Sequence, residues 1–271
     1  MVALTITRSV GDVGAVRGVA AFSQGSLRVF GRGQGWSVVV EGRVRADVDA
    51  GGSIALRLID DSRETAHVAE SVVLVVARAI LERLDGWFHV HAGLVVDDDG
   101  ATLIVGESGA GKTTTTLALA AAAGARLLTD DVVFVQVRDD VLRARGLLRP
   151  LHVGPQTLAM FPALRERLLP GFSSAGKAIV DVDPVDAGSD VVVSRLIFPS
   201  IHAGDTVADP LSSSSVMPLL LRSSAMVAWP GFPRADEHLQ ALGRLSALPA
   251  RALRLGRDAH GDAGAIARAL R

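Results

Sequence analysis

The chain has 271 residues, of which 49% are hydrophobic and 21% charged, which is enough to bury a sizeable core in one large domain or two small ones. Its formal net charge of -1 leaves no broad basic field, so neither nucleic acid nor an anionic membrane surface is an expected partner. The absence of cysteine excludes disulfides, zinc-thiolate sites and thiol catalysis.

Residues 1–85 are expected to form a small, mainly β region that ends in a linking helix. Three short apolar stretches alternate with glycine and aspartate turns, which indicates an antiparallel sheet: Ser26 to Phe30, Trp36 to Val40 and Ile54 to Ile59. From about Ser62 to Leu84 the apolar residues recur at helical spacing, and Asp85-Gly86 ends the pattern. We expect this helix to lead into a second domain at residues 86–271.

The second domain begins with a predicted hairpin and a glycine-rich turn. Strands are predicted from Phe88 to Val96 and from Ala101 to Val105, joined by a tight turn at Asp97 to Gly100. Asp97 to Asp99 is therefore interpreted as part of a turn and not as a metal site. A glycine-rich segment follows at once, and the Ala- and Leu-rich stretch Thr113 to Ala123 predicts a helix that Gly124 ends.

The remaining predicted elements alternate between strand and helix. Strands flank Asp130-Asp131, and a helix through Met217 to Ser223 is expected after a capping run at Ser212 to Ser215. The other predicted strands and helices are listed here: strands at Arg126 to Thr129, Val132 to Val137, Ala178 to Val182 and Val191 to Phe198, and helices at Gln156 to Leu168 and Ala263 to Leu270. This alternation is typical of an α/β fold.

The segment Gly106-Glu107-Ser108-Gly109-Ala110-Gly111-Lys112-Thr113 fits the pattern G-x-x-x-x-G-K-[ST] of a loop that binds nucleotide phosphates. Its glycines let backbone N–H groups surround phosphate oxygens, and the following helix, with Thr114 in its first turn, directs its positive end at the same anion. Lys112 would reach the terminal phosphates, and the Thr113 hydroxyl would bind Mg²⁺. Only two lysines occur, Lys112 and Lys177, which supports a specific need for an ammonium at position 112. The sequence therefore predicts ATP and Mg²⁺ as cofactors.

The pair Asp130-Asp131 follows Thr113 by about one helix and one strand. One carboxylate could hold Mg²⁺ while the other accepts the proton of an attacking hydroxyl. We assign Thr113 and Asp131 to the metal and leave open which aspartate is the base. The competing interpretation is a solvated turn, in which aspartate is common.

The run His91-Ala-Gly-Leu-Val-Val, the segment LIVGESGAGKTTTTLALA and the stretch from Gly124 through Asp130-Asp131 together resemble the catalytic core of HPr kinase/phosphorylase and its relatives. The close match covers about residues 87 to 137, and the C-terminal LPARALRLGRDA resembles the closing strand and helix of the family. The resemblance implies a P-loop kinase of the fold shared with phosphoenolpyruvate carboxykinase, which transfers the γ-phosphoryl group of Mg-ATP to a serine hydroxyl. It also implies that Asp130 and Asp131 share the base and metal roles and that His91 lies near the reacting phosphoryl group, so that His91, Lys112, Asp130 and Asp131 are the catalytic candidates.

Two departures from the family bear on the acceptor. Residues 1–85 do not resemble the regulatory N-terminal domain of the bacterial enzyme, and its downstream glycine-rich signature is not evident near Leu147 to Gly154. A serine of a protein, a precursor peptide or a small molecule is therefore the expected acceptor. The alternative function is a nucleotide-binding switch or ATPase that acts through a protein partner.

Several other polar residues are secondary candidates. His89 shares a strand face with His91, and either histidine could be structural. Lys177 could clamp substrate or nucleotide, or be a solvated surface lysine. Arg149, His152 and Arg195 could stabilise charge or lie at ordinary surface positions.

No stretch reaches the roughly 18 apolar residues of a membrane span, and the N-terminus lacks the pattern of a signal peptide. We therefore expect a cytoplasmic location, where ATP is available. The sequence leaves open a homo-oligomer and the preference between ATP and GTP.

Overall fold

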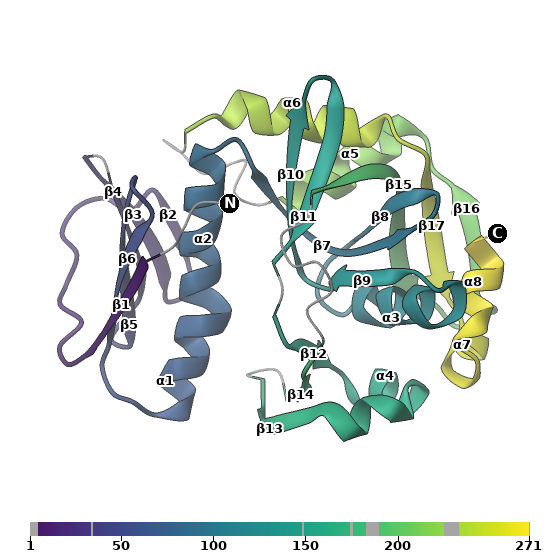
Figure 1. Cartoon of the computed structure of the whole chain (residues 1–271), viewed down its shortest axis with the longest axis horizontal. Coiled ribbons are helices and arrows are strands. Elements are labelled where there is room, and N and C mark those ends of the chain that lie inside the picture. The colour runs from purple at the N-terminus through teal and green to yellow at the C-terminus, as the bar shows by residue number, and fades with distance from the viewer. Residues whose placement is uncertain are drawn as a thin grey trace. The chain divides into compact units, whose positions relative to one another are not determined.

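The computed structural model of the chain describes residues 5–33, 35–147, 149–173, 176–182, 190–224 and 233–270. It is a mixed α/β structure with several sheets (Figure 1), as the strand and helix patterns predict. The chain divides into two compact units. The first comprises the described residues of Met1–Phe88 and Met226–His238, and the second those of His89–Ala225 and Leu239–Arg271. No helix among the described residues is long and apolar enough to cross a membrane.

The first unit is built on a six-stranded sheet whose strands follow the order β1-β6-β5-β4-β3-β2. Neighbours are antiparallel except β1 and β6, which are parallel. The strand bounds are β1 Thr5–Val10, β2 Phe22–Gln24, β3 Leu27–Arg32, β4 Gly35–Val40, β5 Val44–Asp49 and β6 Ser53–Leu58. The three predicted strands are confirmed as β3, β4 and β6. The sequence pattern misses β1, because every one of its residues is exposed, and β5, because arginine and aspartate alternate with its valines. It also misses β2, which is only three residues long.

A continuous helical segment covers one face of this sheet, and the predicted helix from Ser62 to Leu84 is confirmed. It runs through α1 (Arg63–Val68), a π-helical turn η1 (Ala69–Val73) and α2 (Leu74–Leu84). The Ser62 side chain accepts a hydrogen bond from Thr65 N and so satisfies one orphan donor of the first turn. Val73 and Ile80 are buried in the core of this unit, together with Ala46 and Leu56 of the sheet.

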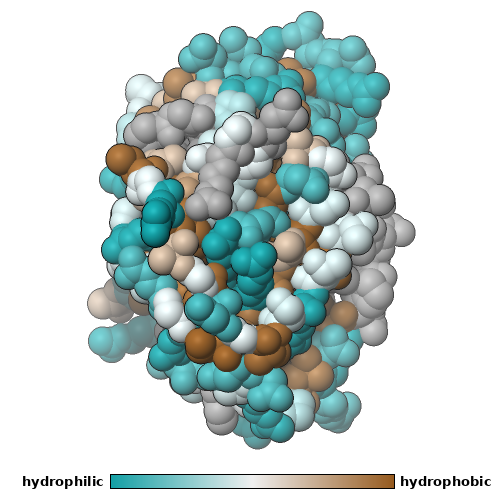
Figure 2. Space-filling model, turned by 90° about the vertical axis from the view of Figure 1, so that its left-hand side faces the viewer, coloured by the Kyte–Doolittle hydropathy of each residue, from teal (hydrophilic) through white to brown (hydrophobic). Residues whose placement is uncertain are grey.

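The opposite face of the sheet is mixed, because Phe30 and Val39 are buried there beside Ser37, Arg45 and Asp47. Asp47 accepts hydrogen bonds from Ser37 and Arg45 across neighbouring positions of β4 and β5. Figure 2 shows the molecule from this side, where hydrophilic and apolar residues are intermixed. The period-2 alternation thus gives the sheet one apolar face, which packs on the helix, and one face on which polar and apolar side chains are mixed.

Residues 83–88 of the first unit contact a residue from much later in the chain. His238 lies in α6 (Ala235–Ser246) and stacks on the Phe88 ring with a centroid separation of 5.0 Å. Its Nδ1 lies 2.9 Å from Nη1 of Arg83, a side chain that is only 2% exposed. Nothing in the sequence pattern near His238 indicates this contact with residues 83–88.

The second unit contains an eight-stranded sheet in the order β11-β10-β7-β8-β15-β17-β16, with β9 paired to β7. β8, β15 and β17 are parallel, so their carboxyl ends meet at one edge of the sheet. The bounds are β7 Phe88–Asp97, β8 Gly100–Val105, β9 Arg126–Thr129, β10 Val132–Arg138, β11 Val141–Gly146, β15 Val191–Ile201, β16 Val207–Pro210 and β17 Ala250–Leu255. All five strands predicted here from apolar patterns are confirmed as β7, β8, β9, β10 and β15.

The predicted helices are confirmed as α3 (Lys112–Ala123) and α8 (Gly264–Leu270), and both contact this sheet. Ile104, Ala118, Ile197 and Ile266 form part of one buried cluster. Gly124 ends α3 in the left-handed conformation that the sequence predicts for a C-cap.

A small three-stranded sheet, ordered β12-β14-β13, lies between β11 and β15 in the chain. Its strands are β12 Leu151–Val153, β13 Leu168–Phe172 and β14 Ala178–Val180. The single helix predicted from Gln156 to Leu168 is wrong in part, because it is divided into α4 (Pro155–Met160) and a 3-10 helix (Pro162–Arg167). Pro162 has no N–H to continue the helix.

Two further helices complete the described fold, α5 (Ser213–Arg222) and α7 (Arg257–Gly261). The prediction of a helix after the serine run is confirmed by α5, but its capping is different from the one expected. Ser212 occupies the N-cap position, yet its hydroxyl bonds to those of Ser214 and Ser215 and not to a backbone N–H.

β7 and α3 approach each other closely at Gly93. A Cβ atom at this position would collide with Thr116 Oγ1 and would lie 3.5 Å from Asp130 Cα. Thr116 is fully buried, and its hydroxyl donates to Lys112 O over 2.8 Å. Only glycine at position 93 lets the strand lie this close to the helix that follows the glycine-rich segment.

We therefore expect Gly93→Ala to destabilise the protein by about 1–3 kcal/mol, the usual cost of overpacking. In the double variant Gly93→Ala, Thr116→Ala the colliding hydroxyl is absent, so part of this loss should be recovered as a coupling free energy in a double-mutant cycle. Urea unfolding measures both. Gly243→Ala is the control, because a Cβ there meets no atom within 4 Å and alanine is the better helix former inside α6, so this variant should not lose stability. Equal unfolding midpoints for Gly93→Ala and the wild type would contradict the prediction.

Candidate functional site

The glycine-rich loop (Gly106–Gly111) connects the buried strand β8 to α3. Gly111 has a φ of 100° and is the N-cap of α3, and a Cβ there would collide with the Leu255 side chain. A side chain at position 111 is thus excluded both by backbone conformation and by space. The hydrogen bond from Ala110 N to Glu107 O, 3.2 Å long, closes the turn inside the loop.

The N-terminus of α3 carries donors that no described side chain caps. This differs from α1, where Ser62 bonds to the first turn. The first backbone N–H groups of a helix have no partner within the helix and lie at the positive end of its dipole. The start of α3 is therefore suited to an anion.

Lys112 folds back onto the loop, and its side chain is buried at 6% exposure. Its Nζ donates to Gly106 O over 2.8 Å and to Glu107 O over 3.0 Å. A third contact joins Nζ to His91 Nε2 at 2.8 Å. All three protons of the ammonium therefore have partners, and two of the three partners are carbonyls of the loop itself.

His91 connects Lys112 to the acidic pair (Asp130 and Asp131). Because the Lys112 ammonium can only donate, His91 Nε2 must accept, and the ring proton lies on Nδ1. Nδ1 is 3.1 Å from both the backbone oxygen and Oδ1 of Asp131. The His91 backbone is also fixed, since its N–H donates to Ser223 O over 2.8 Å.

The two aspartates have different surroundings. Asp130 is buried, and its Oδ2 accepts a hydrogen bond of 2.7 Å from the Thr113 hydroxyl. Asp131 is more exposed, at 39% of its side chain, and its Oδ2 lies 3.3 Å from Nη1 of Arg149. Thr113 therefore lies beside Asp130, whereas Asp131 is held between His91 and Arg149.

Burial and neighbouring charges shift the pKa values of three groups in the site. Burial, together with the adjacent Asp131 charge, raises the pKa of Asp130 to about 6. Burial also lowers the pKa of Lys112 to about 8, although both aspartates oppose this shift. For Asp131, burial raises the pKa, but His91, Arg149 and Lys112 together outweigh it and hold the pKa well below its usual range. Asp131 is thus the aspartate that stays ionised most readily.

The secondary candidates fall in different places. His89 Nδ1 is buried without a partner among the described residues, and its ring lies edge-on to Phe134 at 6.1 Å. Burial lowers the pKa of His89 to about 4, so it is neutral. Lys177 lies between β13 and β14, and its charge helps to lower the pKa of Lys112. His152 lies in β12 opposite Ile179.

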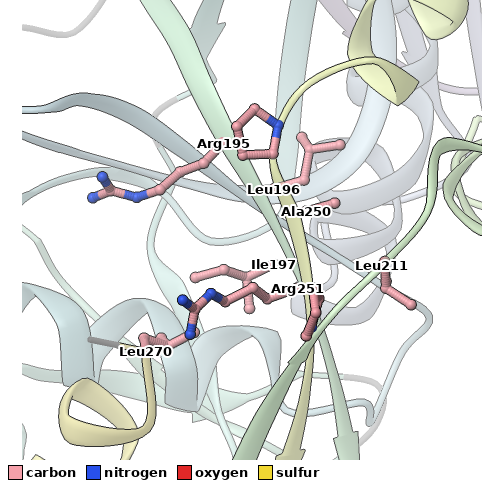
Figure 3. A pocket seen from close by; sticks show the side chains of 9 residues that line it. Arg195, Leu196, Ile197, Leu211, Ala250, Arg251 and Leu270 are labelled. Carbon is pink, nitrogen blue, oxygen red and sulfur yellow. The ribbon is translucent and has the colours of Figure 1, made fainter.

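Arg195 is not part of the site. It pairs with Asp97 and with Asp99 at the turn between β7 and β8, whereas the glycine-rich loop follows the other end of β8. That turn confirms the hairpin interpretation of Asp97 to Asp99. Arg195 also lines a pocket of about 290 Å³ together with Ile197, Arg251 and Leu270, the last residue of α8 (Figure 3).

Some contacts of the site were not expected from the sequence. The Thr114 hydroxyl lies 2.6 Å from that of Thr157 in α4, which connects the start of α3 to the segment carrying the small sheet. Arg222, at the end of α5, lies 3.9 Å from Glu107 of the loop. A lone threonine and a helix-terminal arginine give no sequence signal of such contacts.

Metal binding here would require ligands beyond the protein. Among the described residues, no group of three or more histidine, aspartate or glutamate side chains could hold a metal ion. Mg²⁺ is commonly bound through one or two protein oxygens with phosphate oxygens and water supplying the rest. The Thr113 hydroxyl and the Asp130 carboxylate, 2.7 Å apart, fit such a limited protein contribution.

The raised pKa of Asp130 predicts that its charge destabilises the metal-free protein. The free-energy penalty for ionising Asp130 in the folded state is fully present above about pH 6. It disappears as the pH falls toward the pKa that Asp130 has in the unfolded chain. We expect Asp130→Asn to raise the free energy of unfolding by roughly 2–3 kcal/mol at pH 8, and by much less at pH 4. Denaturant unfolding in EDTA measures the difference. The control is Asp139→Asn, whose side chain is 93% exposed and should change neither value. If the Asp130→Asn variant is less stable than the wild type at pH 8, the raised pKa of Asp130 is contradicted.

Comparison with known proteins gives a distant structural similarity. No family model matches the chain, and no curated protein matches its sequence. Among solved structures, the Hpr(Ser) kinase/phosphatase from Coxiella burnetii is similar over 66% of this chain and 93% of its own, at 15% sequence identity and a TM-score of 0.32.

Proposed function

We propose that this protein is a P-loop kinase that binds Mg-ATP in the glycine-rich loop and transfers the γ-phosphoryl group to a hydroxyl. The observation that carries the proposal is the convergence of Lys112, His91 and the acidic pair at the start of α3. These residues come from β7, from the first turn of α3 and from the turn between β9 and β10. A plain strand-turn-helix connection would not need to bring them together.

Nucleotide binding would use groups that are already oriented. The uncapped N–H groups of α3 would donate to phosphate oxygens. Lys112 would exchange its bonds to Gly106 O and Glu107 O for bonds to the terminal phosphates, which are stronger acceptors because they are charged. In this proposal the ammonium stays hydrogen-bonded to the loop carbonyls until a nucleotide binds.

Mg²⁺ would be held by Thr113 and Asp130, which changes the metal assignment made from the sequence in favour of Asp130. The Thr113 hydroxyl donates to Asp130 and not to Asp131, and the buried Asp130 carboxylate cannot be reached by a bulky acceptor. The ion would offset the burial that raises the pKa of Asp130, so metal binding and ionisation of Asp130 would favour each other.

Asp131 would then accept the proton of the acceptor hydroxyl. The hydroxyl oxygen would form a bond to the γ-phosphorus while the bond to the β-γ bridging oxygen breaks and ADP leaves. His91 and Arg149 hold the two oxygens of Asp131, so both residues would position this base. The half-exposed side chain of Asp131 can be reached by a serine of a protein, a peptide or a small molecule.

The first test separates the roles of the two aspartates. Asp131→Asn should bind Mg-ATP as the wild type does but lose about 10²–10⁴-fold in phosphotransfer, the usual contribution of general base catalysis. Asp130→Asn should weaken the Mg²⁺ dependence of ATP binding. Calorimetry measures binding, and mass spectrometry of candidate peptides and small alcohols incubated with ATP measures transfer. Asp139→Asn, an exposed aspartate outside the site, is the matched control.

A second result would decide between transfer and hydrolysis. If the wild type only releases phosphate to water with every acceptor tried, a nucleotide-binding switch that acts through a partner replaces the kinase. If Lys112→Ala binds Mg-ATP as tightly as the wild type, the loop is not the nucleotide site and the proposal fails.

A further inference from the structure

The layout of the second sheet gives the nucleotide a direction. β8 leads into the glycine-rich loop, with β7 on one side of it and β15 and then β17 on the other. His91 lies on β7, and the acidic pair follows β9, which pairs with β7. A triphosphate whose γ-phosphate meets the acidic pair must therefore extend in the opposite direction, over the carboxyl ends of β15 and β17.

The carboxyl ends of these two strands border the loop directly. Ile201 and Leu255 are the last residues of β15 and β17, and they are register partners. At Gly111, an added Cβ would lie 3.5 Å from Ile201 Cδ1 and would collide with Leu255 Cδ1. Both side chains are thus within van der Waals reach of the position where α3 begins.

The two partners differ in exposure. Leu255 is 3% exposed and belongs to the core, whereas Ile201 is 57% exposed. An isolated exposed isoleucine is common on protein surfaces. Here, however, the exposed apolar side chain lies beside the phosphate-binding turn, on the side away from the acidic pair.

Ile201 is also held in a defined position. It is paired in the sheet, and the following segment is fixed by hydrogen bonds from His202 N to Leu255 O and from Gly256 N to Thr206 Oγ1, each 3.0 Å long. Asp258 in turn accepts from both the N–H and the hydroxyl of Thr206. The apolar surface is therefore presented by a rigid strand end.

On the basis of the proposed function, we propose that Ile201 is the platform against which the base of the bound nucleotide packs. An aliphatic side chain contacts the flat face of a base, and every base has such a face. Ile201 would then contribute to affinity for ATP and for GTP to the same extent, and it would contribute nothing to the binding of the triphosphate tail alone.

The test compares Mg-ATP, Mg-GTP and magnesium tripolyphosphate in calorimetric titrations. Ile201→Ser removes apolar surface at an exposed position, so the fold should be retained, which thermal unfolding checks. We expect about a five- to tenfold loss of affinity for both nucleotides, in line with the apolar area that is left uncovered. Affinity for tripolyphosphate should change less than about twofold, and Ile201→Leu should restore nucleotide binding.

Val192→Ser is the matched control, because Val192 lies at the other end of the same strand and is 50% exposed. It should change none of the three affinities. If Ile201→Ser changes the affinities for ATP and for tripolyphosphate equally, or changes neither, the platform is overturned and the proposed function is left intact. If the wild type binds none of the three ligands in the presence of Mg²⁺, the proposed function is refuted, and the platform with it.

Discussion

The buried ammonium of Lys112 is the group on which the rest of the site depends. A cation with 6% exposure needs hydrogen-bond partners, and it has three, two loop carbonyls and His91 Nε2. Because His91 must accept from this ammonium, its other nitrogen carries the proton and faces Asp131. One buried charge thereby determines the conformation of the loop, the tautomer of the histidine and the orientation of a carboxylate.

The site divides into two parts that differ in burial and in charge compensation. In one part, Asp130 is buried and bonded to the partly buried Thr113, and burial together with the neighbouring Asp131 charge raises its pKa. In the other, Asp131 is compensated by His91 and Arg149 and remains accessible. Neighbouring aspartates thus acquire different properties, and a divalent cation would relieve the part that is destabilised without it.

The elements around the glycine-rich loop could be predicted from local patterns, strands such as β11 and β16 could not, and the contacts within the site could be predicted only in part. The strands β7 to β10, the helix α3 and its C-cap Gly124 follow from apolar periodicity and glycine chemistry, which act over a few residues. Arg149 was one of several arginines that no pattern could rank, and only the three-dimensional contact with Asp131 distinguishes it from Arg195. The helix predicted from Gln156 to Leu168 is interrupted at Pro162, although the helix propensity of the segment favours a single helix.

The contact of His238 with Arg83 and Phe88 has a consequence for dissection of the protein. α6 begins in the first unit and continues into the second, so the chain returns to the first unit after it has built most of the other. A fragment starting after Phe88 would carry His238 without its stacking partner, and a fragment ending there would expose the Phe88 ring and the guanidinium that His238 contacts. Neither half is a contiguous stretch of sequence, and cutting the chain at any single peptide bond would leave one of them incomplete.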